Sequence, residues 1–375
     1  MRPKNLRPAW LEVSKSALAF NCRNIKKKLG REVELLAVVK ANAYGHGAVE
    51  CSQIFLRNGA TSLGVAIIEE GIELRRAGIK APILVVYPEL AGREELVLQN
   101  GLEQTLCDLR FALNLSRLAV KKRTTVSVYL KLDTGMGRYG LSPAECVELV
   151  KKLVHLPGLK VKGLMSHFSS AFMKDKSYSY EELQRFRQTL ELLQKERIDI
   201  PIKSMANSSA TLDLPESYYN QARVGILLYG IYPSAENLRS VPVKPAASLK
   251  ARISFLKNVP RGTPISYMRT YHTRKDSVIA TLPLGYCDGY NFLLSNQGVA
   301  LLRGEKVPVV GRVCMDTLMV DVTSIPKAKL GDELVFIGHQ NGKEISLDEV
   351  AQRAGTISYD IITRMGKRLP LVYTR

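Results

Sequence analysis

The stretch LLAVVKANAYGHG, residues 35–47, joins a run of aliphatic residues directly to a lysine. Leu35 to Val39 have the composition of a buried strand, and Lys40 follows where that strand is expected to end. Small, polar and glycine residues come next, which indicates that the chain turns at this point. A charged amine at the rim of an apolar core requires an explanation, because lysines are usually exposed to water.

The same unit, a short apolar strand followed by helical spacing, recurs along the chain up to about residue 230. Seven more strands are expected at 62–66, 83–86, 102–106, 126–132, 160–168, 202–206 and 222–226. Alternation of this kind implies a parallel sheet, and eight units in about 200 residues predict a closed (β/α)8 barrel, the TIM barrel. An open doubly wound sheet is the alternative, but the Gly-rich dinucleotide fingerprint is missing after the first strand.

A different pattern begins after residue 240. Short alternating stretches such as LKARISFLKNV and DELVFIG are broken by Pro and Gly, and helical spacing returns only in ISLDEVAQRAG near the end. These features predict a second, mainly antiparallel β domain. We therefore expect an α/β fold with a barrel domain at 1–240 and a β domain at 241–375.

Composition and charge limit the class of protein. The chain has 375 residues, 46% hydrophobic and 24% charged, which is typical of a soluble globular protein. Its six cysteines show no metal-like spacing, and neither a signal peptide nor a membrane span is recognisable, so we expect a cytoplasmic protein without a metal. The net charge of +19 suggests nucleic acid as a partner, but no nucleic-acid motif accompanies it, and we expect no specific binding.

Polar residues collect at the carboxyl ends of the expected strands, where barrel enzymes have their active sites. The residues at these ends are Lys40, Lys131, His167, Asn207, Ser208 and Arg223. Any one of them is explained more simply as a polar strand end that meets water. Taken together, two lysines, a histidine, an arginine and an Asn-Ser pair around one rim indicate a site.

Lys40 suggests the chemistry of that site. A lysine acts as a nucleophile only when its amine is neutral, and apolar walls and neighbouring cations favour the neutral form. Such an amine bonds covalently to a carbonyl substrate or to pyridoxal phosphate. Barrels frequently bind phosphate after strands seven and eight, where Ser208, Gly225 and Ile226 lie.

At this level of detail the sequence resembles the alanine racemase family over nearly its whole length. The matching motifs are VVKANAYGHG (38–47), LKLDTGMGRYG (130–140), ANSSAT (206–211), ARVGILLYG (222–230), ISYMRTY (265–271), LGYCDG (284–289), GRVCMDTLMVDV (311–322) and TISYD (356–360). Eight motifs in the family's order are far more specific than any single one. The resemblance implies pyridoxal 5'-phosphate as cofactor and the same barrel-plus-β-domain fold.

The resemblance also implies a role for each matching residue around the cofactor. Lys40 matches the lysine that bonds covalently to the cofactor, Arg223 the arginine facing its pyridine nitrogen, and His167 the histidine beside that arginine. The residues that match contacts to the cofactor phosphate are Tyr44, Ser208, Gly225, Ile226 and Tyr359.

A homodimer with active sites shared between subunits is implied as well. Tyr267 matches the second catalytic base, supplied by the other subunit, and Arg138 matches a residue near the cofactor phenolate and the substrate carboxylate. Lys131 matches a lysine that is carbamylated in several members, where the carbamate would orient the arginine. The other matches are the substrate-side residues Met315 and Asp316, also from the partner, and Tyr286, on the route into the site.

The departures from the family pattern are local. Met268 follows Tyr267 where a small residue is expected in many members, and this change can reshape the pocket. Ser204 and Met205 stand where a histidine is often expected, and Cys287 replaces a small residue. None of these changes removes a catalytic group.

The expected function is therefore interconversion of L- and D-alanine, with Lys40 and Tyr267 as bases on opposite faces of the substrate, supplying D-alanine for peptidoglycan. A racemase of serine or of a broader set of amino acids is the nearest alternative. Decarboxylases of basic amino acids share the architecture, but their motifs are not found. A pyridoxal-phosphate carrier without catalysis would need only a single barrel.

Overall fold

The computed structural model describes residues 7–375, which divide into two compact units. The barrel unit comprises residues 17–43 and 48–244. The β unit comprises residues 44–47 and 245–375 together with the described part of the N-terminal segment up to Ser16.

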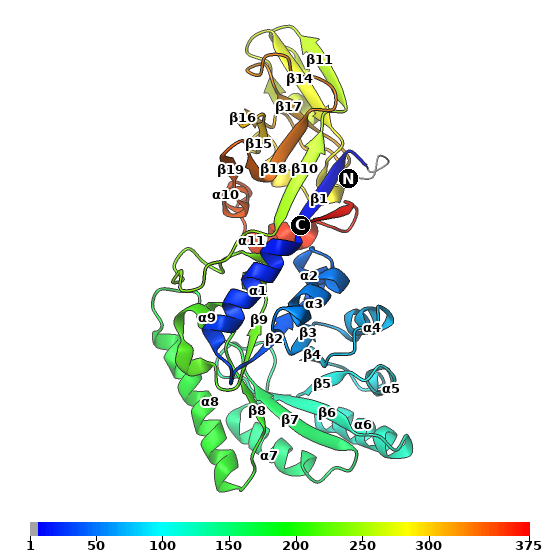
Figure 1. Cartoon of the computed structure of the whole chain (residues 1–375), viewed down its shortest axis with the longest axis vertical. Coiled ribbons are helices and arrows are strands. Elements are labelled where there is room, and N and C mark those ends of the chain that lie inside the picture. Colours follow the sequence, from blue (N-terminus) through cyan, green and yellow to red (C-terminus); the bar gives the residue numbers. More distant parts are fainter. Residues whose placement is uncertain (1–6) are drawn as a thin grey trace. The chain divides into compact units, whose positions relative to one another are not determined.

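The barrel unit confirms the predicted alternation of strands and helices (Figure 1). Eight parallel strands run in the order β8-β7-β6-β5-β4-β3-β2-β9. They are β2 (Glu34–Val38), β3 (Ser62–Val65), β4 (Ile83–Pro88), β5 (Glu103–Leu106), β6 (Val126–Lys131), β7 (Leu159–Met165), β8 (Ile202–Ser204) and β9 (Gln221–Val224). The helices of this part of the chain are α1 (Lys15–Leu29), α2 (Lys40–Tyr44), α3 (Ala48–Arg57), α4 (Ile68–Arg76), α5 (Glu94–Gln99), α6 (Leu109–Lys121), α7 (Pro143–Leu153), α8 (Ser177–Lys195) and α9 (Ser208–Asp213).

The first and last strands of this series, β8 and β9, are linked without a regular ladder. The backbone N–H of Arg223 donates to the carbonyl of Ala206 at 2.9 Å, and Ser204 Oγ donates to the carbonyl of Gln221 at 2.9 Å. The eight-stranded sheet is therefore a nearly closed barrel, and all its strand ends of one polarity lie at one rim.

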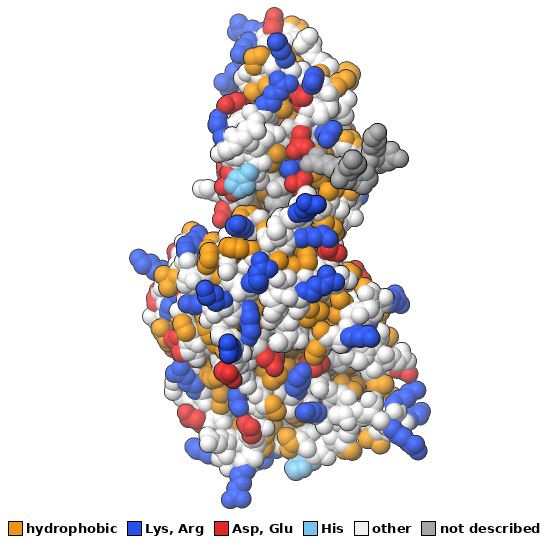
Figure 2. Space-filling model, viewed as in Figure 1, with side chains coloured by type: hydrophobic (Ala, Val, Ile, Leu, Met, Phe, Trp, Pro, Cys, Tyr) orange, Lys and Arg blue, Asp and Glu red, His pale blue; other side chains and the backbone are white. Residues whose placement is uncertain are grey.

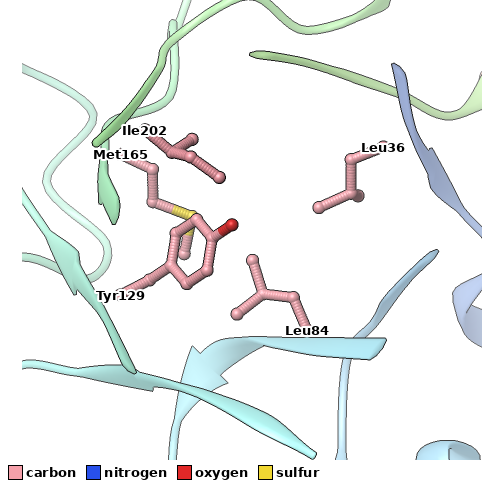
Figure 3. Close-up of a cluster of buried hydrophobic side chains, with 5 residues drawn as sticks. All are labelled: Leu36, Leu84, Tyr129, Met165 and Ile202. Atoms are coloured by element: carbon pink, nitrogen blue, oxygen red, sulfur yellow. The ribbon is translucent and has the colours of Figure 1, made fainter. Parts of the chain in front are cut away.

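Apolar side chains from five strands meet inside the barrel. Figure 3 shows this cluster. Its members, from β2, β4, β6, β7 and β8, are Leu36, Leu84, Tyr129, Met165 and Ile202. A packed interior of this kind supports the rim of the barrel.

The β unit is mainly antiparallel, as predicted. Its largest sheet holds β16 (Glu305–Pro308), β15 (Val299–Leu302), β18 (Glu333–Gln340), β10 (Ala247–Arg252), β1 (Ala9–Ser14) and β20 (Leu371–Thr374), with β19 (Lys343–Ile345) beside β18. A second sheet holds β11 (Phe255–Val259), β14 (Ser277–Leu282) and β17 (Leu318–Asp321), and a small one β12 (Pro264–Ile265) and β13 (Tyr271–His272). The unit also contains α10 (Leu347–Arg353) and α11 (Ser358–Arg364).

The domain boundaries expected from the sequence need one correction. The main division falls between Lys244 and Pro245, near the expected position, but β1 belongs to the β unit and not to the barrel. It pairs antiparallel with β10 and parallel with β20. The residue range 1–240 therefore does not describe the barrel, because β1 completes a sheet whose other strands lie more than 230 residues further along the chain.

Figure 2 shows how charged side chains are distributed on one face of the molecule. On the face that Figure 2 shows, Lys and Arg side chains are scattered among other residues and do not merge into one stripe. Scattered positive charges of this kind give a general positive potential and do not outline a binding surface for nucleic acid on this face. Among residues 7–375, no helix is long and apolar enough to cross a membrane, and no group of His, Cys, Asp and Glu is arranged to hold a metal.

We predict that Gly163→Ala destabilises the barrel unit. A Cβ at Gly163 would lie 2.3 Å from ring atoms of Tyr129, whose side chain is fully buried. Overpacking of this kind costs about 1–3 kcal/mol in the free energy of unfolding, which thermal or denaturant unfolding measures. The same substitution in a Tyr129→Leu background should cost clearly less, and an equal loss in both backgrounds would contradict the explanation.

Candidate active site

The segment after β2 fixes Lys40 at the rim of the barrel by an unusual backbone. Ala41, Asn42 and Ala43 have φ values of 52°, 53° and 53° with ψ near 50°, which is a left-handed turn made entirely of non-glycine residues. This conformation costs about 1–2 kcal/mol per residue, so it persists only where neighbours hold it. Glu70 Oε1 accepts from the N–H of Ala41 at 2.6 Å, and Asn42 Oδ1 accepts from the N–H of Ala48 at 2.8 Å.

Lys40 lies in an aromatic and cationic environment. Its Nζ donates to the hydroxyl of Tyr87 at 3.2 Å and lies 5.2 Å from the centre of the same ring. The guanidinium of Arg138 is also 5.2 Å from that ring centre. The structure therefore brings two residues expected from the sequence, Lys40 and Arg138, to one tyrosine that the sequence reasoning missed.

Arg223 is a buried cation held by neutral acceptors. Its Nη1 donates to the carbonyl and the Oγ of Ser204, at 2.8 and 2.7 Å. Its Nη2 makes a short bond to the carbonyl of Ser166 and lies 3.4 Å from Nδ1 of His167. Burial lowers the pKa of Arg223 to about 10, so the guanidinium is still charged at neutral pH.

The positive charges in this region also change the protonation of two neighbours. Burial, followed by the charges of Arg223 and Arg138, lowers the pKa of Lys131 well below that of an ordinary lysine. Burial, followed by the charges of Lys131 and Arg223, lowers the pKa of His167 well below its ordinary value. The histidine is therefore neutral at neutral pH and can accept a hydrogen bond from the arginine.

The loops after β8 and β9 form the part of the rim expected to bind phosphate. Asn207 caps α9 by accepting from the N–H of Ala210 at 3.0 Å, and Ser208 begins that helix. Ser208 Oγ accepts from the N–H of Gly225 at 3.0 Å, and Ile226 begins the next helical turn, Ile226–Tyr229. The predicted Ser208, Gly225 and Ile226 are thus brought together.

The β unit carries the remaining predicted residues in two groups. Tyr44 and Tyr359 lie side by side, with ring centres 6.3 Å apart. The second group lies on the loops around Tyr267, Tyr286 and Met315. Ser266 Oγ donates to the carbonyl of Arg312 at 2.7 Å, and the N–H of Cys287 donates to the carbonyl of Met315 at 3.1 Å.

Tyr267 is presented on a strained turn. Ser266 and Met268, on either side of it, have φ values of 66° and 59°. The side chains of Tyr267 and Met268 are 70% and 77% exposed. The methionine therefore occupies a backbone conformation that favours glycine, which explains why a small residue is expected at this position.

Asp316 is held by a charge network inside the β unit. The guanidinium of Arg368 donates to Asp316 at 2.6 Å and to the buried Asp288 at 2.9 Å. Asp288 also accepts two bonds from Arg7, at 2.5 and 2.7 Å. A buried carboxylate shared by two arginines keeps this loop fixed, because removing one partner would leave a buried charge unpaired.

The residues present fit an anionic cofactor with an aldehyde. No ion pair joins Lys40, Lys131, Arg138 or Arg223 to a carboxylate in the part of the chain that the structure describes. Positive charge that no ion pair compensates at this rim favours an anionic ligand. The lysine at the strand end provides the amine that such a cofactor requires.

Three supporting residues were missed by the sequence reasoning. Ser166 and Ser204 hold Arg223, and Tyr87 contacts Lys40. Tyr87 is the last residue but one of β4, the third strand of the barrel, so the rule that identified the other strand ends applies to it as well. Ser166 gave no signal, and Ser204 was noted only as a departure from the family pattern, because their bonds to Arg223 join different strands and leave no local pattern.

Comparison with known proteins gives one consistent result. Family models described as the N-terminal and C-terminal domains of alanine racemase match residues 13–233 and 246–373. The chain is 46% identical to an alanine racemase of Halothermothrix orenii over 373 residues, covering 100% of this chain and 98% of that protein. It is 42% identical to an alanine racemase of Clostridium novyi, covering 99% and 97%.

Solved structures agree with this result. The structure of alanine racemase from Bacillus anthracis with bound L-Ala-P has a TM-score of 0.94 and 35% identity, covering 100% of this chain and 96% of that one. Alanine racemase from Bartonella henselae with covalently bound pyridoxal phosphate has a TM-score of 0.87 and 28% identity, covering 98% and 99%.

We predict that Lys131→Met stabilises the protein near neutral pH when carbon dioxide is excluded. The pKa of Lys131 is lower in the folded than in the unfolded chain, so the unfolded chain binds more protons and stability rises with pH. Below its folded-state pKa, the buried charge of Lys131 lowers the free energy of unfolding. Replacing the lysine by methionine removes this cost, which is about 1 kcal/mol or more for a buried charge.

The gain in the free energy of unfolding from Lys131→Met should shrink as the pH approaches about 10.4, the pKa of an unfolded lysine. Thermal unfolding of both proteins between pH 7 and 9.5 measures it. Lys160→Met, at an exposed position of β7, controls for the loss of a surface charge. A gain that does not change with pH would contradict the prediction.

Proposed function

The chain belongs to the alanine racemase family, and on that premise we propose that Lys40 and Tyr267 are the two bases that remove and return the Cα proton of alanine. The reaction is the interconversion of L- and D-alanine. The observation that carries the proposal is the position of Lys40, fixed by a strained turn at a cationic barrel rim.

The proposed cofactor is pyridoxal 5'-phosphate, bonded to Lys40. When bound, it supplies the electron sink that makes the Cα proton removable. Ser208, Gly225 and Ile226 are proposed to hold its phosphate. What supports this is that Ser208 Oγ accepts from the N–H of Gly225 at 3.0 Å and that Ile226 begins the next helical turn, so these residues lie together after β8 and β9. By family resemblance the same role is proposed for Tyr44 and Tyr359.

Arg223 is proposed to face the ring nitrogen of the cofactor. A guanidinium has no acceptor and is charged at neutral pH, so it leaves that nitrogen unprotonated. His167, whose low pKa keeps it neutral, accepts a hydrogen bond and fixes the guanidinium together with Ser204. The weaker electron sink that results is proposed to favour racemisation over transamination.

Arg138 and Lys131 are proposed to bind the substrate side. Arg138 supplies a positive charge for the carboxylate of alanine. The lowered pKa of Lys131 favours its neutral amine, which is the form that reacts with carbon dioxide to give a carbamate. A carbamate there would carry negative charge and orient Arg138.

Tyr267 is proposed to act in the site of a second subunit. Its 70% exposure on the β unit is typical of a residue that reaches its target only across an interface. Met315, Asp316 and Tyr286, on the loops beside it, are proposed to line the substrate side and the route into the same site. The active form is then a homodimer in the cytoplasm that supplies D-alanine for peptidoglycan.

Serine is the competing substrate. Met268 lies next to Tyr267 and is 77% exposed, so it adds bulk to the loop that presents the base. Comparison of kcat/KM for alanine and serine tests this alternative, and a higher value for serine would replace the proposed substrate.

We predict that the variants Lys40→Ala and Tyr267→Phe each lose racemisation by about 10²-fold or more, because each removes one base. Mixed dimers of the two inactive chains contain one intact site. If half of the dimers are mixed, about a quarter of the wild-type activity returns. D-Alanine formation after subunit exchange measures this recovery.

The control is each variant mixed with itself, which should stay inactive. If mixed dimers are shown to form but have no activity, the proposal that each site combines Lys40 of one subunit with Tyr267 of the other is contradicted.

We predict that Arg223→Glu raises transamination relative to racemisation by about tenfold, which corresponds to a change of about 1.4 kcal/mol in relative barriers. A carboxylate at this position would hold the ring nitrogen protonated. Pyruvate and D-alanine formed from L-alanine give the ratio. Arg223→Gln removes the charge without adding a carboxylate and should show a smaller change in this ratio. An unchanged ratio in the Arg223→Glu variant would exclude the proposal that Arg223 suppresses transamination.

A further inference from the structure

Tyr87 lies in a β-bulge at the rim of the barrel. Along β4, Val85 pairs with Gln104 of β5, but the next pair is Pro88 with Thr105. Val86 and Tyr87 are therefore extra residues on β4. Bulges of this kind re-aim a side chain and are common beside active sites.

Two buried polar side chains hold this bulge. Gln104 Nε2 donates to the carbonyl of Tyr87 at 2.9 Å, and Thr105 Oγ1 donates to the carbonyl of Val85 at 2.6 Å. Both side chains are completely buried. These two bonds to backbone carbonyls hold the bulge at Val85 and Tyr87, where the regular ladder is interrupted.

The side chain of Tyr87 contacts both Lys40 and Arg138. Its hydroxyl accepts from Lys40 Nζ at 3.2 Å, and its ring centre lies 5.2 Å from both Lys40 Nζ and the guanidinium of Arg138. The ring of Tyr139 supports it from another direction, at a centre-to-centre distance of 5.3 Å. The negative face of an aromatic ring attracts cations within about 6 Å.

We propose that Tyr87 is a positioning residue for both Lys40 and Arg138. Its hydroxyl gives the amine of Lys40 a fixed hydrogen-bond acceptor, and its ring attracts the guanidinium of Arg138. The inference rests on the proposed function in one respect, namely that Lys40 is a base. Tyr87 transfers no proton itself, and the reaction it assists is proton transfer at Lys40 Nζ.

The test compares Tyr87→Phe with Tyr139→Phe, which removes a hydroxyl from the neighbouring ring. Uptake of pyridoxal phosphate by the cofactor-free protein, followed by absorbance, should be about tenfold slower for Tyr87→Phe and unchanged for Tyr139→Phe. This readout does not depend on racemase activity.

A second readout separates positioning from a general structural effect. With α-deuterated D- and L-alanine, Tyr87→Phe should raise the primary isotope effect for the enantiomer whose proton Lys40 removes and leave the other unchanged. A general disturbance of the site would alter both isotope effects together.

Tyr87→Leu removes the ring as well. It should raise KM for alanine beyond the effect of Tyr87→Phe, because Arg138 loses its aromatic contact. The proposal is overturned if Tyr87→Phe behaves like Tyr139→Phe in cofactor uptake and in both isotope effects. Failure of the proposed function gives a different result, namely a wild-type protein that forms no D-alanine or a Lys40→Ala variant that remains active.

Discussion

Uncompensated positive charge at one rim of the barrel is the constraint on which the rest of the site depends. Parallel strands place Lys40, Lys131 and Arg223 at the same edge. Cations taken out of water without an anionic partner are unfavourable, and the lowered pKa values of Lys131 and His167 follow from this. The proposed anionic cofactor and a carboxylate substrate would provide counter-charge, so these positive charges favour the proposed ligands.

Neutral hydrogen-bond acceptors hold these cations in place. The guanidinium of Arg223 is held by Ser166, Ser204 and His167, none of which is an acid. The ammonium of Lys40 is held by Tyr87. A carboxylate bonded to Arg223 or to Lys40 would neutralise the positive charge that the proposed chemistry uses. Hydroxyls, carbonyls and an imidazole hold these groups without neutralising them. Strained turns occur at 41–44, after Lys40, and, separately, around Tyr267.

The sequence predicts the barrel well because its strands are short apolar runs with helical spacing between them, and each of the eight is present. The strand ends indicate Lys40, Lys131, His167 and Arg223 for the same reason. The strand β1 was missed because its partners, β10 and β20, are distant in the sequence. The bulge at Tyr87 was missed because a register shift against β5 leaves no local pattern. The left-handed turn after Lys40 contains no glycine of its own and could not be recognised from composition.

The central claim is that Lys40, and no other lysine, bonds to pyridoxal phosphate. Borohydride reduction of the protein incubated with this cofactor makes the lysine–cofactor bond permanent, and peptide mapping by mass spectrometry then identifies the modified residue. The account predicts a phosphopyridoxyl group on Lys40 at close to one per chain, and no stoichiometric modification at Lys131 or at surface lysines. A group on another lysine at that level, or none on Lys40, would contradict it.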